Sequence, residues 1–375
     1  MKILIDARMV SETYNGIARY VVLLAKGLRE IKNQKGLTYR PVFLVRKGFL
    51  DSLASVLFPE SAKSFSGFET IEAESSFLHP REVFEIPRIL KTHKISLYHS
   101  PSFSSLLYSP CPWIVTVHDL NHLQFGGIKE KIYYHFLLKR FSKKATQLLT
   151  VSGFSRKELS KWLGMDERKI KVVYNAIDPF FDFPMPQSQM DSILSGFKLK
   201  NKEYFICLSN SKKHKNTKLL VTAYLKFKKE NKNAPPLVLC LGTKYYKSTT
   251  SVIFLNSLSE LETKALLSGA KAVFFPSLYE GFGLPPLEGA VCGSPIVVSE
   301  IAPHLEALSD VPPSEVHFVQ AKDYYGWVQA FSRVMKKEVL PPSLDTQARL
   351  LERFSVIRLG ETMDGVYKEI LEGIL

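Results

Sequence analysis

The stretch Ser277–Glu300, SLYEGFGLPPLEGAVCGSPIVVSE, lies between two short apolar runs, at 272–275 and 296–298. It holds two glutamates, Glu280 and Glu288, with Gly-Phe-Gly and Pro-Pro between them. Paired glycines let a backbone approach a ligand closely, and prolines are tolerated in the first turn of a helix. The stretch therefore predicts a strand, a ligand-binding loop, a helix and a second strand, which is the repeating unit of parallel α/β sheets.

The same alternation of apolar runs and helical patterns extends through most of the 375 residues. A chain of this length exceeds what one hydrophobic core usually supports. The alternation breaks once, at Asn175–Gln187, where prolines and aromatics predict a linker. We therefore expect two doubly wound, Rossmann-like α/β domains facing a cleft, at 1–178 and 179–354. The remaining residues, 355–375, predict a helix that packs back on the first domain.

Eleven strands are expected in this arrangement. In the first domain they are Lys2–Asp6, Pro41–Val45, Ile95–His99, Trp113–Val117, Leu148–Val151 and Lys171–Val173. In the second they are Tyr204–Leu208, Leu237–Leu241, Val252–Leu255, Ala272–Phe275 and Ile296–Val298. Open α/β sheets bind ligands beyond the carboxyl ends of their strands. The candidate loops are those that follow Asp6, Val117, Val151, Leu208, Leu255 and Phe275.

Composition describes a folded chain with 45% hydrophobic and 23% charged residues. Four scattered cysteines and no apolar stretch near ~20 residues predict a reducing, cytoplasmic location without a membrane span. The net charge of +14 favours anionic partners. The basic amphipathic segment 127–145 predicts peripheral contact with an anionic membrane at its inner face, or else an ordinary solvated helix. Nucleic acid is not expected, because no known binding module is recognisable.

The glycine loop predicts the ligand. Backbone amides near 282–286 and the positive end of the following helix can bind a phosphate or a sugar oxygen. Glu280 and Glu288 would instead accept hydrogen bonds from hydroxyls, with Glu288 on the polar side of the helix. A nucleotide sugar has both hydroxyls and a diphosphate. A plain capped helix is the alternative, and it leaves the paired glycines unexplained.

The pattern E-GFG-LP-LE, with seven residues between the glutamates, resembles retaining glycosyltransferases of family 4, which have the GT-B fold. The resemblance extends along nearly the whole chain in consistent order. Its other motifs are NGIARY (Asn15–Tyr20), VTVHDL (Val115–Leu120), VSGFSRKEL (Val151–Leu159), VVYNAID (Val172–Asp178) and LSNSKKHKN (Leu208–Asn216). By this resemblance Glu280 contacts the donor sugar and Glu288 the nucleotide ribose. Donor-binding positions at the glycine loop are Gly281, Phe282, Gly283 and Leu284.

The resemblance also assigns basic residues to the diphosphate. Lys215 matches the phosphate-binding lysine, and Lys212 stands in for a second basic residue that is often arginine. The alternative is a solvated lysine run ahead of a helix. Two departures follow later in the chain: SEIAPHLEAL lacks the proline that relatives often carry before Glu306, and Gln320 replaces a frequent aspartate.

In the first domain, Gly16 matches a glycine of the family that begins a helix, and by the resemblance it binds the donor. Ala18 stands where relatives commonly have a second glycine, which predicts a narrower approach to the ligand. His118 matches the position that contacts the transferred sugar, and the alternative is a structural histidine. His118 and His122 lie four apart, but without a third ligand we expect no metal and no other cofactor.

Together these features predict a retaining hexosyltransferase that acts on a nucleotide sugar donor. GDP-mannose is the first choice of donor, because the sequences SLYEGFGLPPLE and HKN resemble those of bacterial polysaccharide mannosyltransferases. The expected acceptor is a lipid-linked or growing glycan in cell-surface polysaccharide or lipopolysaccharide biosynthesis. Glu280, His118 and Lys215 are the expected catalytic residues. The alternatives are a sugar-nucleotide epimerase, a phosphorylase or a non-catalytic nucleotide-sugar-binding protein.

Overall fold

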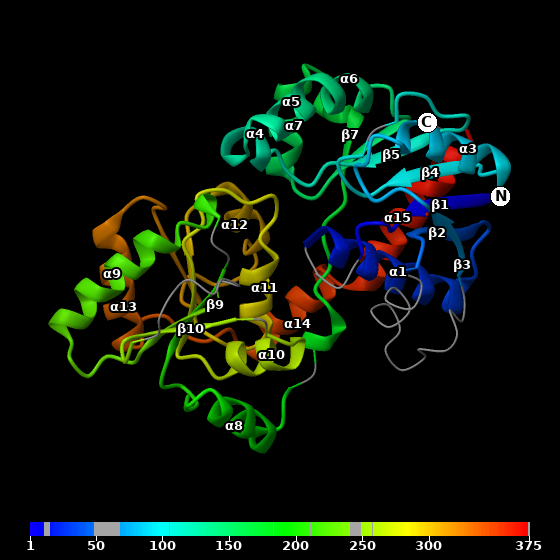
Figure 1. Ribbon diagram of the computed structural model, residues 1–375. Helices are drawn as coiled ribbons and strands as arrows, with labels where there is room; N and C mark the ends of the chain where they lie inside the picture. The colour runs from blue at the N-terminus through cyan, green and yellow to red at the C-terminus, as the bar shows by residue number, and fades with distance from the viewer. Residues whose placement is uncertain are drawn as a thin grey trace. The chain divides into compact units, whose positions relative to one another are not determined.

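The computed structural model describes residues 1–10, 16–48, 68–104, 106–182, 184–209, 212–240, 249–256 and 258–373. The chain forms two compact units (Figure 1). The first unit comprises Met1–Ala176 together with Phe354–Leu375, and the second comprises Ile177–Arg353. Of the predicted site motifs, Asn15, Asn210 and Ser211 lie outside the described residues.

The first unit is built on a parallel sheet in the order β3-β2-β1-β4-β5-β6-β7. Its strands are β1 (Lys2–Asp6), β2 (Arg40–Arg46), β3 (Glu69–Ala73), β4 (Leu97–Ser100), β5 (Trp113–Thr116), β6 (Gln147–Thr150) and β7 (Ile170–Val172). In the centre, Ile3 of β1 lies opposite both Pro41 and Leu97. The central strands are apolar along their length because helices cover both faces of a parallel sheet.

Helices pack on both faces of this sheet. They are α1 (Gly16–Lys35), α3 (Glu82–Thr92), α4 (Asn121–Phe125), α5 (Ile128–Ile132), α6 (Lys139–Ser142), α7 (Gly153–Leu163) and α15 (Val356–Leu371). The predicted basic helix is therefore not one regular helix, because a π-helix over Tyr133–Leu138 joins α5 to α6.

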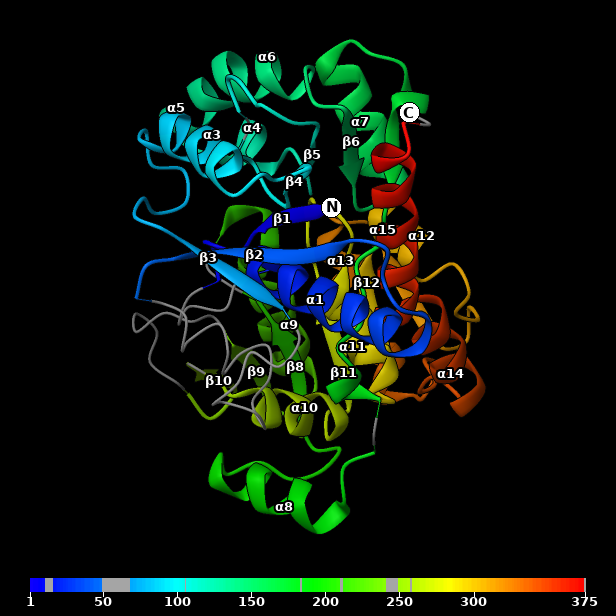
Figure 2. The same cartoon turned by 90° about the vertical axis from the view of Figure 1, so that its right-hand side faces the viewer.

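The last helix of the chain packs on the first helix of the same unit (Figures 1 and 2). Gly27 of α1 and Gly360 of α15 lie at this crossing. A Cβ atom built on Gly27 would approach the carbonyl oxygen of Val356 to 2.3 Å. The two backbones therefore meet without side chains between them, and only glycine fits at these two positions.

The second unit has a parallel sheet in the order β10-β9-β8-β11-β12-β13. Its strands are β8 (Phe205–Leu208), β9 (Leu237–Cys240), β10 (Val252–Leu255), β11 (Ala272–Phe275), β12 (Ile296–Ser299) and β13 (Val316–Val319). Its helices are α8 (Gln187–Gly196), α9 (Thr217–Glu230), α10 (Glu260–Ser268), α11 (Leu284–Val291), α12 (Ala302–Ala307), α13 (Tyr324–Met335) and α14 (Leu344–Arg353). On one face, Phe331 of α13 stacks on Phe274 of β11 with ring centroids 4.3 Å apart.

The predicted pair of parallel α/β domains is confirmed, but two strands were not predicted. Both unpredicted strands, β3 and β13, lie at the edge of their sheets. The sequence of β3, ETIEA, alternates glutamates with other residues, and that of β13, VHFV, has a histidine among its apolar residues. Edge strands carry a weaker apolar signal because one of their sides is not covered by another strand.

Each sheet has a switch point, where the order of strands reverses direction. In the first unit it lies between β1 and β4, and in the second between β8 and β11. Ligands of open α/β sheets bind at the carboxyl ends of the strands that flank this point. In the second unit, those strand ends lead into the lysine motif and into the glycine loop.

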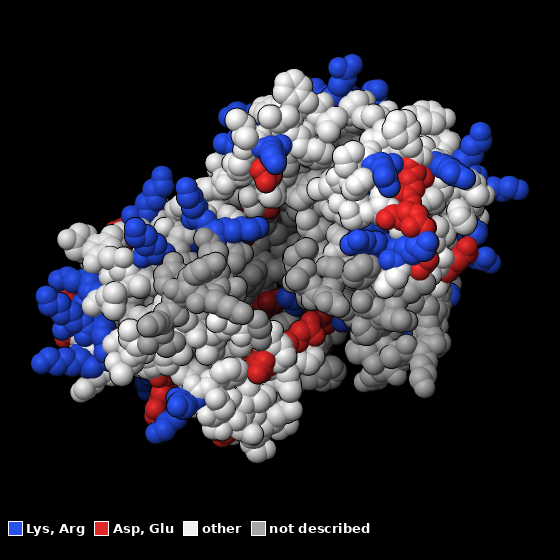
Figure 3. Space-filling model, viewed as in Figure 1, with Lys and Arg blue, Asp and Glu red and all other residues white. Residues whose placement is uncertain are grey.

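The positive charge of the chain is spread over its surface. Lys and Arg side chains gather around α9 and α13 in the space-filling view (Figure 3). Among the residues that the structure describes, no helix is both long and apolar enough to span a bilayer.

Candidate active site

The switch point of the second unit brings the lysine motif to the glycine loop. Lys215 lies in a 3₁₀ turn over Lys213–Lys215, which follows β8. The backbone N–H of Leu278, in the loop after β11, donates to the carbonyl of His214 at 2.7 Å. This bond fixes the two loops together, and Lys215 Nζ reaches Glu280 Oε1 at 2.6 Å.

Glu280 is held by more than the lysine. The hydroxyl of Ser277 donates to the same carboxylate oxygen at 2.6 Å. Lys215 and Glu280 side chains are only 17% and 16% exposed. Burial is the largest single effect and raises the pKa of the Glu280 carboxyl, but the charge of Lys215 and the hydrogen bonds from Lys215 and Ser277 act together against it, and the pKa is lowered. Glu280 is therefore an ionised hydrogen-bond acceptor at neutral pH.

The glycine loop leads directly into α11. Gly283 precedes the helix with φ +114°, a conformation that other residues rarely adopt. Leu284 begins α11, and Pro285 and Pro286 follow it in the first turn. The first amides of a helix have no partner within the helix, and they carry its positive dipole end. Because Pro285 and Pro286 have no N–H, Leu284 is the one backbone donor among the first three residues of α11, and the helix dipole at this end favours an anion or a sugar oxygen. Of the loop residues, Gly281 and Phe282 are buried.

Glu288 does not occupy the exposed polar face that the sequence predicts. Every residue of α11 from Pro286 to Val291 is buried, so this part of the helix has no polar side. Glu288 itself is only 4% exposed. α11 packs against β11 and β12 of the sheet and also against α10 and α14. A carboxylate buried there is costly unless polar groups compensate for its lost hydration.

Lys212 and Asn216 flank the lysine turn. Lys212 is exposed at the N-cap position, and its carbonyl accepts the N–H of Lys215 at 3.0 Å. Asn216 has φ +52°, and its side-chain amide donates to the carbonyl of Ala321 at 2.8 Å. Asparagine tolerates this left-handed conformation better than most residues, and it allows α9 to begin at Thr217. Lys215 is thus the lysine that the structure brings to Glu280.

His304 of α12 is a site residue that the sequence analysis missed. It lies beneath the glycine loop, because a Cβ atom on Gly283 would be 3.1 Å from its Cδ2 atom. Its Nδ1 atom donates to the carbonyl of Ser299 at 2.9 Å. Its Nε2 atom is buried and has no hydrogen-bond partner among the described residues. The histidine stands in SEIAPHLEAL, just before Glu306, and this proximity to the glutamate block is the signal for it.

Burial and charge act in opposite directions on His304. Burial lowers the pKa of its imidazole, and the nearby Glu280 carboxylate partly offsets this effect. The neutral ring carries its proton on Nδ1, since a carbonyl oxygen can only accept. Nε2 is then an acceptor that faces the underside of the glycine loop.

The first unit contributes a separate set of predicted residues. Gly16 begins α1 and is exposed, and no described heavy atom lies within 4 Å of a Cβ placed there. Ala18 is fully buried in the core of the unit. Its methyl group therefore packs between α1 and the sheet, and the expectation that Ala18 narrows the approach to a ligand is wrong.

His118 follows β5 and is 8% exposed. Its Nε2 atom donates to the carbonyl of Pro101 at 2.9 Å, and its ring packs edge-on against Tyr20. Burial lowers the pKa of His118 to about 4, so the ring is neutral at pH 7. The proton on Nε2 leaves Nδ1 as an acceptor, which suits a hydroxyl donor.

The second histidine of the pair has a packing role. The ring of His122 lies edge-on to Phe103, with centroids 5.5 Å apart. Within the described ranges, no three His, Cys, Asp or Glu side chains are arranged to hold a metal ion.

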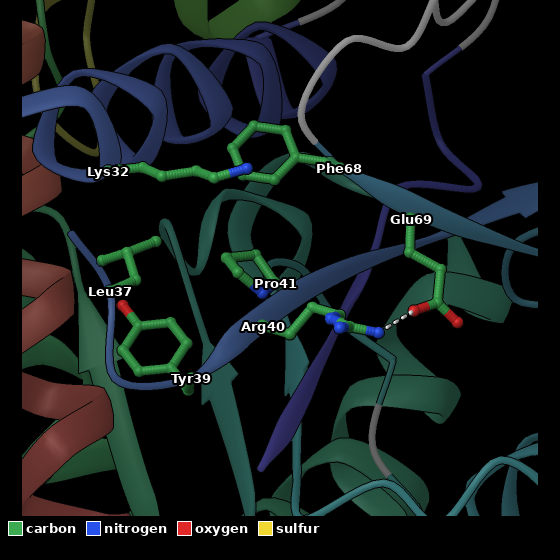
Figure 4. A pocket seen from close by; sticks show the side chains of 7 residues that line it. All are labelled: Lys32, Leu37, Tyr39, Arg40, Pro41, Phe68 and Glu69. Atoms are coloured by element: carbon green, nitrogen blue, oxygen red, sulfur yellow. Dashed lines mark ion pairs between the residues drawn. The ribbon is translucent and has the colours of Figure 1, made fainter.

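One pocket of about 500 Å³ lies away from these loops, at the amino ends of β2 and β3 (Figure 4). Lys32 lies over the ring of Phe68, with Nζ 5.7 Å from its centroid, and Arg40 pairs with Glu69 at 3.6 Å. Ligands of α/β sheets bind at the opposite, carboxyl edge. This pocket therefore carries no part of the candidate site.

Two family models match successive parts of the chain. Glycosyltransferase Family 4 matches residues 14–180, and Glycosyl transferases group 1 matches residues 193–350. The chain belongs to glycosyltransferase family 4. The first match ends and the second begins on either side of residues 181–192, close to the boundary of the two units, so each model accounts for one Rossmann-like domain.

Known relatives of this family 4 chain include O-antigen enzymes. It is 28% identical to the O-antigen chain mannosyltransferase RfbU of Salmonella typhimurium over 64% of this chain and 65% of that protein. It is 25% identical to the O-antigen chain mannosyltransferase B of Escherichia coli over 86% and 89% of the two chains.

Solved structures share the whole fold. A glycosyltransferase from Rickettsia africae superposes with a TM-score of 0.73 at 16% identity, covering 99% of this chain and 98% of that one. The Anabaena protein HepE, solved with UDP and glucose, gives a TM-score of 0.71 at 16% identity, covering 98% and 100%. The expected GT-B fold of family 4 is confirmed.

Proposed function

We propose that this family 4 chain transfers a hexose from a nucleoside-diphosphate sugar to a hydroxyl of a glycan, with retention at the anomeric carbon. The observation that carries the proposal is the ion pair of Lys215 and Glu280, 2.6 Å long, beside a helix that begins with a glycine loop. The pair supplies a cation for phosphate and a carboxylate for hydroxyls within one switch point.

In this proposal the diphosphate replaces Glu280 as the partner of Lys215. The Lys215 ammonium and the amides of Phe282–Leu284 stabilise the negative charge that develops on the leaving diphosphate. Glu280, already ionised, then accepts hydrogen bonds from the donor sugar. His118 and Gly16 contribute from the first unit, as the family resemblance implies, and His118 Nδ1 accepts from a sugar hydroxyl. Glu288 binds the ribose of the nucleotide.

The order of events at the sugar is the one that the family resemblance implies. The bond between the anomeric carbon and the diphosphate oxygen breaks, and the acceptor oxygen bonds to the same face of the sugar. The departing phosphate oxygen takes the proton of the acceptor hydroxyl. Glu280 and His118 orient the ring and form no bond to it, so their contribution is positional. No metal or other cofactor is required in this scheme.

We propose GDP-mannose as the donor and a lipid-linked or growing cell-surface glycan as the acceptor. Two relatives that match this chain are named as O-antigen mannosyltransferases, which supports mannose. The HepE structure was solved with UDP and glucose, so UDP-glucose is the competing donor. Peripheral contact of the segment 127–145 with an anionic membrane would bring the enzyme to such an acceptor.

Thermal unfolding in the presence of GDP-, UDP-, ADP- and dTDP-sugars tests the donor. A ligand at 100 times its dissociation constant stabilises the folded state by about 2.7 kcal/mol, which is easily measured. We expect GDP-mannose to raise Tm in the wild type and to have a smaller effect in Lys215→Met. Equal shifts in both chains, or none with any nucleotide sugar, would refute the assigned site.

The stereochemistry and the cofactor requirement need product analysis. Proton NMR of the product formed with a glycan acceptor should show the anomeric configuration of the donor. Activity should persist after EDTA treatment. An inverted product, or activity that depends on added divalent metal, would contradict the mechanism while leaving the donor assignment intact.

A further inference from the structure

A second pocket, of about 600 Å³, opens in the first unit at the carboxyl ends of β2 and β3. This is the edge at which α/β sheets bind ligands. None of the residues assigned to the transfer reaction lines it. The residues that matter below are Arg46, His79, Arg81, Phe84, Glu85 and Arg88.

One face of α3 forms a wall of this pocket. Arg81, Phe84 and Arg88 are spaced by three and four residues, so they lie along one side of the helix. The Phe84 side chain is 81% exposed, which is unusual for so large an apolar group. An exposed aromatic ring between two guanidinium groups offers an apolar face and positive charge side by side.

The loop that follows β3 and lines the pocket is fixed by hydrogen bonds from two directions. In front, the Glu85 carboxylate accepts the backbone N–H groups of Glu74 and Ser75 at 2.6 and 2.9 Å. Behind, the buried Arg8 donates from Nη1 to the hydroxyl of Ser75 at 3.2 Å. Leu78, in the same loop, has φ +61°, and its N–H donates to Glu82 at 3.0 Å. A strained loop fixed this firmly is preorganised for binding.

The charges around the pocket favour an anion. Glu85 is engaged by backbone amides, and Glu74 pairs with Lys47 at 2.6 Å. His79 accepts the N–H of Arg81 on Nδ1 at 3.2 Å, so Nε2 carries the proton of the neutral ring and can donate. Three guanidinium groups and this N–H therefore line the pocket as donors, and guanidinium groups match carboxylate and phosphate in bidentate geometry.

We propose that this pocket binds an acidic saccharide, with the sugar ring against Phe84 and its phosphate or carboxylate on Arg81, Arg88 and Arg46. Its identity as the acceptor glycan rests on the proposed function, but the binding itself does not. A sugar ring presents C–H groups that pack on an aromatic face, and its anion then reaches the adjacent guanidinium groups. The concave shape favours a saccharide over a membrane, because small ligands bind in concave pockets whereas an amphipathic helix presents an outward apolar face to a bilayer.

Calorimetric titration of the full chain with glucose 1-phosphate, glucuronate, inorganic phosphate and methyl glucoside tests this site. The titrations use the Lys215→Met chain, so that the proposed donor site does not contribute. We expect glucose 1-phosphate or glucuronate to bind, and methyl glucoside not to bind. Whichever of the first two is tighter identifies phosphate or carboxylate as the anion.

Substitutions then locate the site. Arg81→Gln with Arg88→Gln should weaken binding by about tenfold or more, because charge-assisted hydrogen bonds are lost. Phe84→Ala should weaken the binding of glucose 1-phosphate but not the binding of inorganic phosphate. Lys91→Gln with Lys157→Gln removes the same charge from exposed positions of the same unit, and it should change nothing. Circular dichroism checks that each variant is folded.

Three results would overturn the proposal. The first is equal binding of methyl glucoside and the acidic sugars, and the second is an equal loss in the two double variants. The third is loss of binding to phosphatidylglycerol vesicles, rather than to the sugars, in Arg81→Gln with Arg88→Gln. If the chain binds these sugars but no nucleotide sugar, the proposal for this site stands and the proposed transfer reaction is refuted.

Discussion

Lys215 Nζ lies 2.6 Å from Glu280 Oε1, and both side chains are largely buried. These groups come from loops after β8 and β11, 65 residues apart in the sequence. Each is therefore the counter-ion of the other when no donor is bound. In the proposed complex, a diphosphate that pairs with Lys215 takes this counter-ion from Glu280, and the Glu280 carboxylate then accepts from sugar hydroxyls, so the binding of phosphate and of sugar is coupled through one ion pair.

The first prediction concerns this pair. Glu280→Gln keeps the shape of the side chain but removes its charge, and it should lower kcat/KM by about 10²-fold, as for other preorganised electrostatic groups. Lys215→Met should lose at least as much, and it should also raise the pKa of Glu280 in a pH profile of activity, because the dominant opposing charge is gone. Lys213→Met, an exposed neighbour in the same turn, is the control. Unchanged transfer in either site variant would contradict the assigned roles.

The second prediction concerns Gly283, which has φ +114° and lies over His304. Gly283→Ala should destabilise the second unit by about 1–3 kcal/mol through backbone strain, and it should also weaken nucleotide-sugar binding. Gly164 has φ +65° with no described neighbour near its Cβ position. Gly164→Ala should therefore lower stability but leave nucleotide-sugar binding unchanged. His304→Asn, which can still donate to Ser299, removes Nε2 while the hydrogen bond to Ser299 is kept. Donor binding that is equal in Gly283→Ala and Gly164→Ala would argue against a ligand role for the loop.

The third prediction concerns the packing of α15 on α1. A Cβ on Gly360 would lie 2.5 Å from the carbonyl oxygen of Gly27, so the two backbones must separate. Gly360→Ala should cost about 2–3 kcal/mol of the free energy of unfolding of the first unit. Gly365, on the same helix, has no described atom near its Cβ position. Gly365→Ala should stabilise the chain by about 0.5–1 kcal/mol through helix propensity. Urea unfolding of both variants distinguishes the two effects, and equal midpoints would disprove the close crossing.

The fourth prediction is a pH dependence of stability. His118 has a pKa of about 4 in the folded chain, below its ordinary value, so the unfolded chain binds more protons between these values. The contribution of neutral His118 to the free energy of unfolding is complete above pH 6.5. It decreases as the pH falls below that value and is lost once the pH has fallen through 4. From pH 7 to pH 5 this loss is about 2 kcal/mol.

The measurement needs a signal from the first unit alone. Trp113 and Trp162 belong to that unit, and Trp327 belongs to the other. Urea unfolding followed by fluorescence in a Trp327→Phe background therefore reports the first unit. His118→Gln, which can still donate to Pro101, should lose less stability between pH 7 and pH 5 than the parent chain. An identical pH dependence in the two chains would show that His118 is not buried in the neutral form.

The fifth prediction concerns the segment 127–145. Ile128 and Phe136 are 76% and 71% exposed there, among lysines and arginines. If this surface lies on a membrane, Ile128→Ser with Phe136→Ser should release the chain from vesicles that contain phosphatidylglycerol. Phe84→Ser removes an equally exposed ring elsewhere in the same unit, and it should leave vesicle binding intact. Binding that does not respond to salt or to either variant would make the segment an ordinary solvated surface.

Much of the fold could be predicted because a parallel sheet covered on both faces needs continuous apolar strands. The central strands β1, β8 and β11 all carried that signal. Two edge strands did not: ETIEA in β3 alternates charge with apolar residues, and VHFV in β13 has a histidine among its apolar residues. The residue types of the site could likewise be predicted. Paired glycines let the backbone approach a ligand, prolines are tolerated in a first helical turn, and lysines supply positive charge. His304 was missed because its contacts with Ser299 and with the glycine loop depend on the fold.

The sequence by itself determined that the chain forms two α/β units, and that lysines and a glycine loop follow two of its strands. Only the tertiary structure decided that those two strands are neighbours at a switch point, with Lys215 on Glu280 and His304 beneath Gly283. Periodicity reports which residues must be buried within each element, because burial of apolar surface is a local requirement. The order of strands depends on how whole helices and strands pack, and residues far apart in the sequence meet only through that packing.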